Sequence, residues 1–131
     1  MLHPLIQKWN QLESWLFFRN KALFYLYGSA CVVHIVMWGV FFANLQTIYQ
    51  PTKEFITLHY KVGIGPDFVG PWYVILTIPL CAMIVLILNC FLGRLIYHNE
   101  RFSAYTLAAT ALMVQLVCGW ALYLIIKANL F

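Results

Sequence analysis

Three long apolar runs with no formal charge inside them constrain this chain more than any other feature. They cover residues 22–45, 72–92 and 103–126, and Arg94 and Lys127 follow the second and third runs. The hydrocarbon core of a bilayer is about 30 Å thick, and a helix crosses it with about 20 residues. Because a segment in lipid must satisfy its own backbone hydrogen bonds, each run should be helical. The sequence predicts one all-α membrane domain with three transmembrane helices, in contact with the lipid bilayer.

Composition supports a membrane protein. Apolar residues make up 63% of the 131 residues and charged residues 9%, whereas a soluble domain is about half apolar and a quarter charged. The eight basic residues are scattered along the chain, so no nucleic-acid partner is expected. The four cysteines lie in the apolar runs without Cys-x-x-Cys spacing, and we expect neither a metal nor another cofactor.

The segment before the first run has a different pattern. Leu5, Trp9, Leu12 and Leu16 recur at helical spacing within residues 4–18, and polar residues lie between them. This pattern is typical of an amphipathic helix lying in the membrane interface. A helix packed on the soluble surface of a partner is the alternative. We also expect the first span to be retained as an anchor, because cleavage near Cys31 would leave an apolar N-terminus.

Basic residues near the spans indicate an orientation. One side of the predicted topology has five of them and the other has three: Lys8, Arg19, Lys21, Arg94 and Arg101 against Lys53, Lys61 and Lys127. The larger set predicts a multi-pass protein with a cytoplasmic N-terminus and an outside C-terminus.

Polar side chains within the spans predict how the helices pair. His34 and Gln115 lie near the middle of the first and third spans, while Asn89 and Thr110 lie at a similar depth nearer the inner side. We expect His34 to approach Gln115 and Asn89 to approach Thr110, each pair contributing about 1 kcal/mol or less. His34 is interpreted as a structural histidine, because no second histidine or carboxylate occupies a span.

Packing seams follow from residue size, since small residues let helices approach closely in lipid. In the second span, Pro79 should kink the helix by freeing the carbonyl of Ile75. The expected seams are Gly28, Val32, Ile35, Gly39 and Ala43 in the first span, Ile78, Ala82, Val85, Asn89 and Gly93 in the second, and Ala104, Ala108, Ala111, Gln115, Cys118 or Gly119, and Leu122 in the third.

The loop at residues 46–71 is predicted to lie outside and contains the other candidate groups. Glu54, His59, Tyr60 and Asp67 could in principle bind a metal or exchange protons. Nothing in the sequence fixes their geometry, so neither catalysis nor metal binding is the favoured interpretation. Residues 55–60 alternate as in a strand, and the glycines and prolines that follow are interpreted as turn formers.

The loop also carries a resemblance. Its Leu-His-Tyr at residues 58–60, followed by glycines, Asp67 and Gly-Pro-Trp-Tyr at residues 70–73, resembles small uncharacterised three-span bacterial membrane proteins over residues 51–100. The loop alone weakly resembles that of bacterial immunity-type membrane proteins, although Lys61 stands where those have asparagine. Neither resemblance implies a catalytic residue.

These observations and the resemblance favour a non-enzymatic assembly, accessory or interaction subunit of the bacterial inner membrane, which contacts copies of itself or a larger membrane protein. One alternative is a subunit of an oligomeric transporter or channel that uses His34, Asn89 and Gln115. A membrane enzyme that uses His59 and Asp67 is a further alternative.

Overall fold

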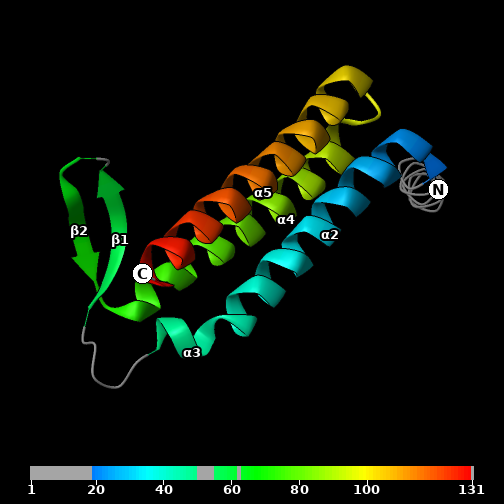
Figure 1. Cartoon of the computed structure of the whole chain (residues 1–131). Coiled ribbons are helices and arrows are strands. Elements are labelled where there is room, and N and C mark those ends of the chain that lie inside the picture. The colour runs from blue at the N-terminus through cyan, green and yellow to red at the C-terminus, as the bar shows by residue number, and fades with distance from the viewer. Residues whose placement is uncertain (1–18, 50–54, 62, 131) are drawn as a thin grey trace, which may run out of the picture.

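The computed structural model describes residues 19–49, 55–61 and 63–130 (Figure 1). The interfacial helix expected at residues 4–18 and the candidate Glu54 lie outside the described residues, as does the side chain of Tyr60. The elements are α2 (Lys21–Ala43), α3 (Leu45–Ile48), β1 (Ile56–Lys61), β2 (Gly65–Gly70), the 3-10 helix η1 (Trp72–Leu76), α4 (Thr77–Ile96) and α5 (Arg101–Leu130).

Three helical segments in the described part of the chain are long and apolar enough to cross a membrane. They are Lys21–Ala43, Trp72–Ile96 and Arg101–Asn129, which confirms the three spans expected from the sequence. The second and third helices extend beyond the predicted runs and include Arg94 and Lys127. The all-α expectation needs one correction, because an antiparallel hairpin of β1 and β2 joins the first two spans.

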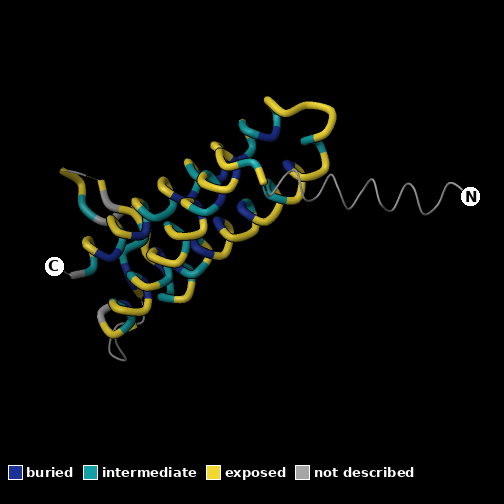
Figure 2. Tube along the Cα trace, turned by 90° about the vertical axis from the view of Figure 1, so that its right-hand side faces the viewer, coloured by how far each residue is buried: buried dark blue, intermediate teal, exposed yellow. Residues whose placement is uncertain are grey.

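The three long helices lie side by side, and α5 packs against both of the others (Figure 1). The start of α2 and the turn between α4 and α5 lie together at one end, here called the turn end. The end of α5, the short α3 and the hairpin lie at the other, here called the hairpin end. Buried residues face the middle of the bundle and exposed residues face outward (Figure 2), as expected when lipid solvates the outer surface.

The seam predicted for α5 is confirmed. Its fully buried residues lie three, four or seven positions apart and are Ala104, Ala108, Ala111, Gln115 and Leu122, while Cys118 and Gly119 between the last two are half-buried. On α4, Ala82 and Gly93 of the predicted seam are buried. Gly93 permits a close approach, because a Cβ there would lie 2.6 Å from the Tyr27 hydroxyl of α2.

The seam predicted for α2 is wrong. Val32 and Ile35 are exposed, and no atom would lie within 4 Å of a Cβ added at Gly28 or Gly39. The buried face instead carries larger side chains, which are Leu23, Tyr27, Met37 and Phe41 beside Ala30. Bulky residues fill the space between α2 and its neighbours, so α2 does not pack through its glycines.

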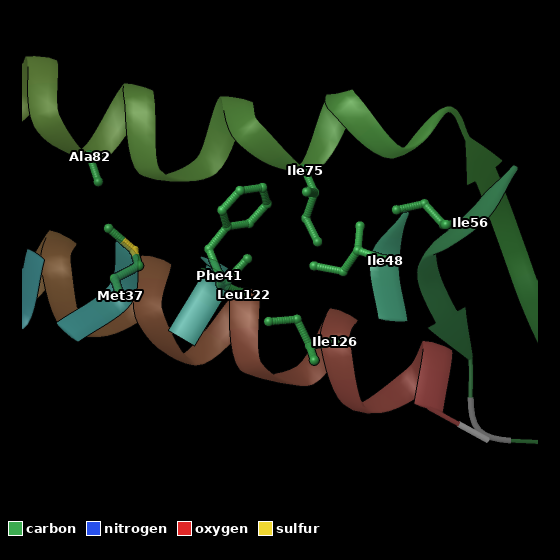
Figure 3. Packing of buried hydrophobic residues seen from close by; sticks show 8 residues of the cluster. All are labelled: Met37, Phe41, Ile48, Ile56, Ile75, Ala82, Leu122 and Ile126. Atoms are coloured by element: carbon green, nitrogen blue, oxygen red, sulfur yellow. The ribbon is translucent and has the colours of Figure 1, made fainter. Parts of the chain in front are cut away.

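An apolar cluster joins the bundle to the hairpin (Figure 3). Phe41 lies between the α4 and α5 ribbons, and Ile75 and Ile126 lie beside it. The cluster continues through Ile48 of α3 to Ile56 of β1. Because Ile56 is 3% exposed, the first residue of the hairpin belongs to the core of the molecule.

The hairpin and the start of α4 follow from local sequence. Gly63 and Gly65 have φ of 86° and 101°, values that non-glycine residues rarely adopt. The strand character expected for residues 55–60 is confirmed, but residues 65–70 also form a strand and not only turns. Pro79 lies in the first turn of α4, directly after η1. Pro79, which has no backbone N–H to donate, thus lies where the backbone changes from 3-10 to α geometry.

Candidate functional site

A chain of polar contacts crosses the middle of the bundle. The indole Nε1 of Trp38 donates to His34 Nε2 at 3.0 Å, and His34 Nδ1 lies 3.0 Å from Gln115 Oε1. The Gln115 amide Nε2 then donates to the main-chain carbonyl of Ala82 at 2.7 Å. The predicted approach of His34 to Gln115 is therefore confirmed, and the contact extends from α2 through α5 to α4.

The indole fixes the role of each nitrogen of His34. An indole N–H only donates, so Nε2 must accept from Trp38 and Nδ1 must carry the proton that is donated to Gln115. Gln115 is fully buried, and its amide oxygen and nitrogen each have a partner on another helix. Such a satisfied network fixes the relative positions of the three helices.

The predicted pairing of Asn89 with Thr110 is not found. Thr110 is exposed, and its hydroxyl donates to the carbonyl of Thr106 on its own helix at 2.8 Å. A threonine within a helix commonly satisfies its hydroxyl in this way and needs no partner on another helix. Asn89 contributes its main-chain carbonyl, which accepts from the Tyr27 hydroxyl at 2.8 Å.

Asn129 attaches the hairpin to α5. Its Oδ1 accepts from the backbone N–H of Thr57 at 2.8 Å, and its Nδ2 donates to the Thr57 carbonyl at 2.7 Å. The same Nδ2 also donates to the Ile125 carbonyl at 2.8 Å. A side-chain amide thus pairs with one strand residue as a neighbouring strand would, which holds β1 at the end of α5.

Three charged or titratable side chains meet on the hairpin. His59 Nδ1 lies 2.5 Å from Asp67 Oδ1, and Lys61 Nζ lies 2.9 Å from Asp67 Oδ2. The hydrogen bond from Lys61, followed by that from His59, lowers the pKa of the Asp67 carboxyl group below its usual value. The side chains of His59 and Lys61 are 61% and 56% exposed, so water screens this cluster.

A second polar cluster ties the helices together at the turn end. Asn20 Nδ2 donates to the hydroxyl of Tyr97 at 3.0 Å and to that of Tyr105 at 2.6 Å. Its Oδ1 accepts from the backbone N–H groups of Ala22 and Leu23, which caps the N-terminus of α2. One asparagine therefore starts α2 and joins it to α4 and α5.

The sequence interpretation missed Trp38, Asn129 and Asn20. Trp38 could have been found, since it follows His34 by four residues and therefore shares its helix face. Asn129 is 72 positions away from its partner Thr57, and no local pattern connects the two. Asn20 precedes the first apolar run, where a capping residue is expected, but its tyrosine partners are not predictable from that position.

Among the residues that the structure describes, no three His, Cys, Asp or Glu side chains are grouped so that they could hold a metal ion. Of the loop candidates, the structure brings together His59 and Asp67 and adds Lys61 to them. Comparisons of the chain with protein-family models, with curated proteins and with solved structures found no match.

Proposed function

We propose that this protein is a non-enzymatic subunit of a membrane-protein assembly, and that its hairpin contacts a larger membrane protein. The observation that carries the proposal is a set of exposed apolar side chains outside the three spans. Phe55, Ile64, Phe68 and Val69 belong to the hairpin or its edges, and between 54% and 79% of each side chain is exposed. Grouped apolar side chains outside lipid commonly mark an interaction site.

The attachment of the hairpin supports the same role. The Asn129 amide and buried Ile56 hold β1 against the bundle. A contact element that is held in place loses little conformational entropy when a partner binds. The hairpin therefore combines an apolar surface with a fixed position relative to the spans.

Substitution of two exposed apolar residues in the hairpin tests the proposal. The full-length protein would be purified with its bound proteins in a mild detergent, and the proteins would be identified and quantified by mass spectrometry. We expect a stoichiometric membrane-protein partner, and we expect the double variant Ile64→Ser, Phe68→Ser to lose it.

Phe102→Ser is the matched control, because Phe102 is 81% exposed at the turn end. This variant should retain the partner. Purification of the wild-type protein without a stoichiometric partner would contradict the proposal, and so would an equal loss of the partner in both variants.

The two alternatives have less support. A transport pathway through His34 and Gln115 would have to break hydrogen bonds that join the three helices. Transport activity that is lost in His34→Ala, with the protein still inserted, would favour this alternative. Acid–base chemistry at His59 and Asp67 would occur in an open, hydrated site, whereas catalytic groups are usually tuned by burial. An activity lost in the double alanine variant of His59 and Asp67 would favour an enzyme.

The assignment to a bacterial inner membrane with a cytoplasmic N-terminus belongs to the same proposal. The orientation is supported by the basic residues at the turn end, which are Arg19, Lys21, Arg94 and Arg101. Accessibility of a tag at each terminus to an impermeant reagent in intact cells would test this orientation.

A further inference from the structure

Exposed positive charge is concentrated at the turn end. Arg19 and Lys21 flank the cap of α2, Arg94 lies in the last turn of α4, and Arg101 begins α5; all four residues are exposed. Glu100 is the one carboxylate in the described chain there, and it accepts a hydrogen bond from the Ser103 hydroxyl at 2.8 Å. The described residues at this end therefore carry four positive charges and one negative charge.

The hairpin end differs, although it also has basic residues. Lys61 forms an ion pair with Asp67, and Lys127 is the basic residue in the last turn of α5. Within the described residues, this end therefore has two positive charges and one negative charge. The two ends of the same bundle thus differ in net charge as well as in shape.

One of the basic side chains at the turn end, that of Arg101, has a defined contact. The guanidinium carbon of Arg101 lies 5.9 Å from the centroid of the Tyr97 ring, a distance at which a cation is attracted to an aromatic face. The Tyr97 hydroxyl accepts from Asn20, which caps α2 between Arg19 and Lys21. Arg101 is therefore linked through two side chains to the start of another helix.

The backbone adds to this positive potential. The N-termini of α2 and α5 lie at the turn end, and helix N-termini carry partial positive charge and attract anions. The C-terminus of α4 contributes the opposite sign, but Arg94 lies in its last turn. The side chains and two of the three helix ends thus favour an anion at the same place.

We propose that the turn end binds the phosphodiester headgroup of an anionic phospholipid, with Arg101 and Arg94 as its principal ligands. The three apolar helices end here, so lipid headgroups are the anions nearest to these side chains. A guanidinium pairs with phosphate through two parallel hydrogen bonds, which an ammonium group cannot form. The site would select a lipid by the charge of its headgroup.

Native mass spectrometry of the full-length protein in detergent, with phosphatidylglycerol and phosphatidylcholine added in equal amounts, tests this inference. The wild-type protein should retain phosphatidylglycerol preferentially. In the double variant Arg94→Gln, Arg101→Gln, the preference for phosphatidylglycerol should fall about fivefold for each arginine removed. Lys127→Gln is the matched control at the hairpin end, and it should keep the preference.

Two further measurements separate a built site from general attraction. Arg101→Lys keeps the charge, so a site that depends on a paired guanidinium predicts a weaker preference, whereas diffuse attraction predicts no change. Competition with millimolar glycerol phosphate distinguishes the lipid from a free phosphate, and the lipid should remain bound.

The inference would be overturned by equal losses in Lys127→Gln and the double variant, by an unchanged preference in Arg101→Lys, or by displacement with glycerol phosphate. Because partner capture is not measured, these results are independent of the proposed role of the hairpin.

Discussion

The two ends of the bundle are stabilised in different ways. At the turn end, one polar side chain, Asn20, joins α2 to Tyr97, directly after α4, and to Tyr105 of α5, and both tyrosines also pack against an apolar cluster. At the hairpin end, an apolar cluster that includes Ile48, Ile56 and Ile126 holds the elements together, and the Asn129 amide adds hydrogen bonds to one strand. A hydrogen bond depends on one donor, one acceptor and their geometry, whereas apolar packing is shared among many side chains.

This difference has a consequence for what each end presents to its surroundings. The hairpin end buries Ile56 but leaves Ile64 and Phe68 exposed beside its charged cluster, so its outer surface offers apolar side chains that suit a protein contact. The turn end leaves Arg94 and Arg101 exposed around a hydrogen-bonded centre, so its outer surface is charged and suits an anion. Substitutions within the bundle, and then at each end, can test this contrast.

The largest effect should come from Ala111→Leu, which disturbs the apolar cluster in the half of the bundle toward the turn end. Ala111 is fully buried in a cluster with Leu23, Tyr27 and Leu86, and three additional carbons cannot fit without separating the helices. The free energy of unfolding in mixed micelles, measured by titration with a denaturing detergent, should fall by about 3 kcal/mol. Ala109→Leu on the exposed face of α5 is the control and should cost less than about 0.5 kcal/mol. Equal losses would show that α5 does not pack through its alanines.

Gln115→Ala should have the next largest effect, because it removes the side chain that connects α2 to α4 through α5. His34 Nδ1 would lose its acceptor, and a cavity would remain where Gln115 is fully buried. We expect a loss of about 2 kcal/mol in the same titration. Combined with His34→Ala in a double-mutant cycle, it should show a coupling energy of about 1 kcal/mol. Additive effects would mean that the two side chains do not interact.

Substitutions of Asn20 and of Asn129 compare the two ends directly. Asn20→Ala removes a helix cap and two tyrosine contacts, so the unfolding free energy should fall by about 1–2 kcal/mol. Asn129→Ala should cost about 1 kcal/mol or less, and mainly in the hairpin, because Ile56 still packs in the core. Hydrogen exchange should show faster exchange at the Thr57 amide in Asn129→Ala, while amides of α2 near Asn20 stay protected. A larger loss of unfolding free energy in Asn129→Ala than in Asn20→Ala would show that the hairpin end depends on hydrogen bonds.

The smallest effect should come from pH. The pKa of Asp67 is lower in the folded protein, chiefly through Lys61 and then through His59, so its ionised form is favoured by folding. The resulting stabilisation is complete above the unfolded pKa of this group and is lost as the pH falls through its folded pKa. In an NMR titration, the Asp67 carboxyl should have a midpoint below that of an unstructured aspartate. Lys61→Gln should raise this midpoint more than His59→Gln, and the opposite order would assign the larger effect to the histidine.

Residue pattern predicts the three spans and the α5 seam because both depend on local properties. Hydropathy over about 20 residues indicates a span, and alanines at helical spacing, such as Ala104, Ala108 and Ala111, indicate a close contact. The His34–Gln115 contact was predictable from depth, since each residue lies near the middle of its span. These features require no knowledge of the other helices beyond their lengths.

The remaining features depend on shape in three dimensions. The absence of close packing at Gly28 and Gly39 in α2 could not be predicted, because Tyr27, Met37 and Phe41 occupy the interface instead. Strand β2 contains glycine and proline in the sequence Gly-Pro-Asp-Phe-Val-Gly, which indicates turns when read alone. Its pairing with β1 provides the strand geometry. The Asn129–Thr57 contact joins residues that only the complete fold brings together.

The central position of α5 has a consequence for the order in which the protein assembles. This helix packs against both α2 and α4, and it supplies Gln115, the acceptor for His34. Because α2 and α4 are synthesised before α5, His34 lacks its acceptor Gln115 until α5 inserts. Insertion of the third span then satisfies His34 and attaches β1 through Asn129. The third of the long helices therefore completes native contacts of α2, α3, α4 and β1.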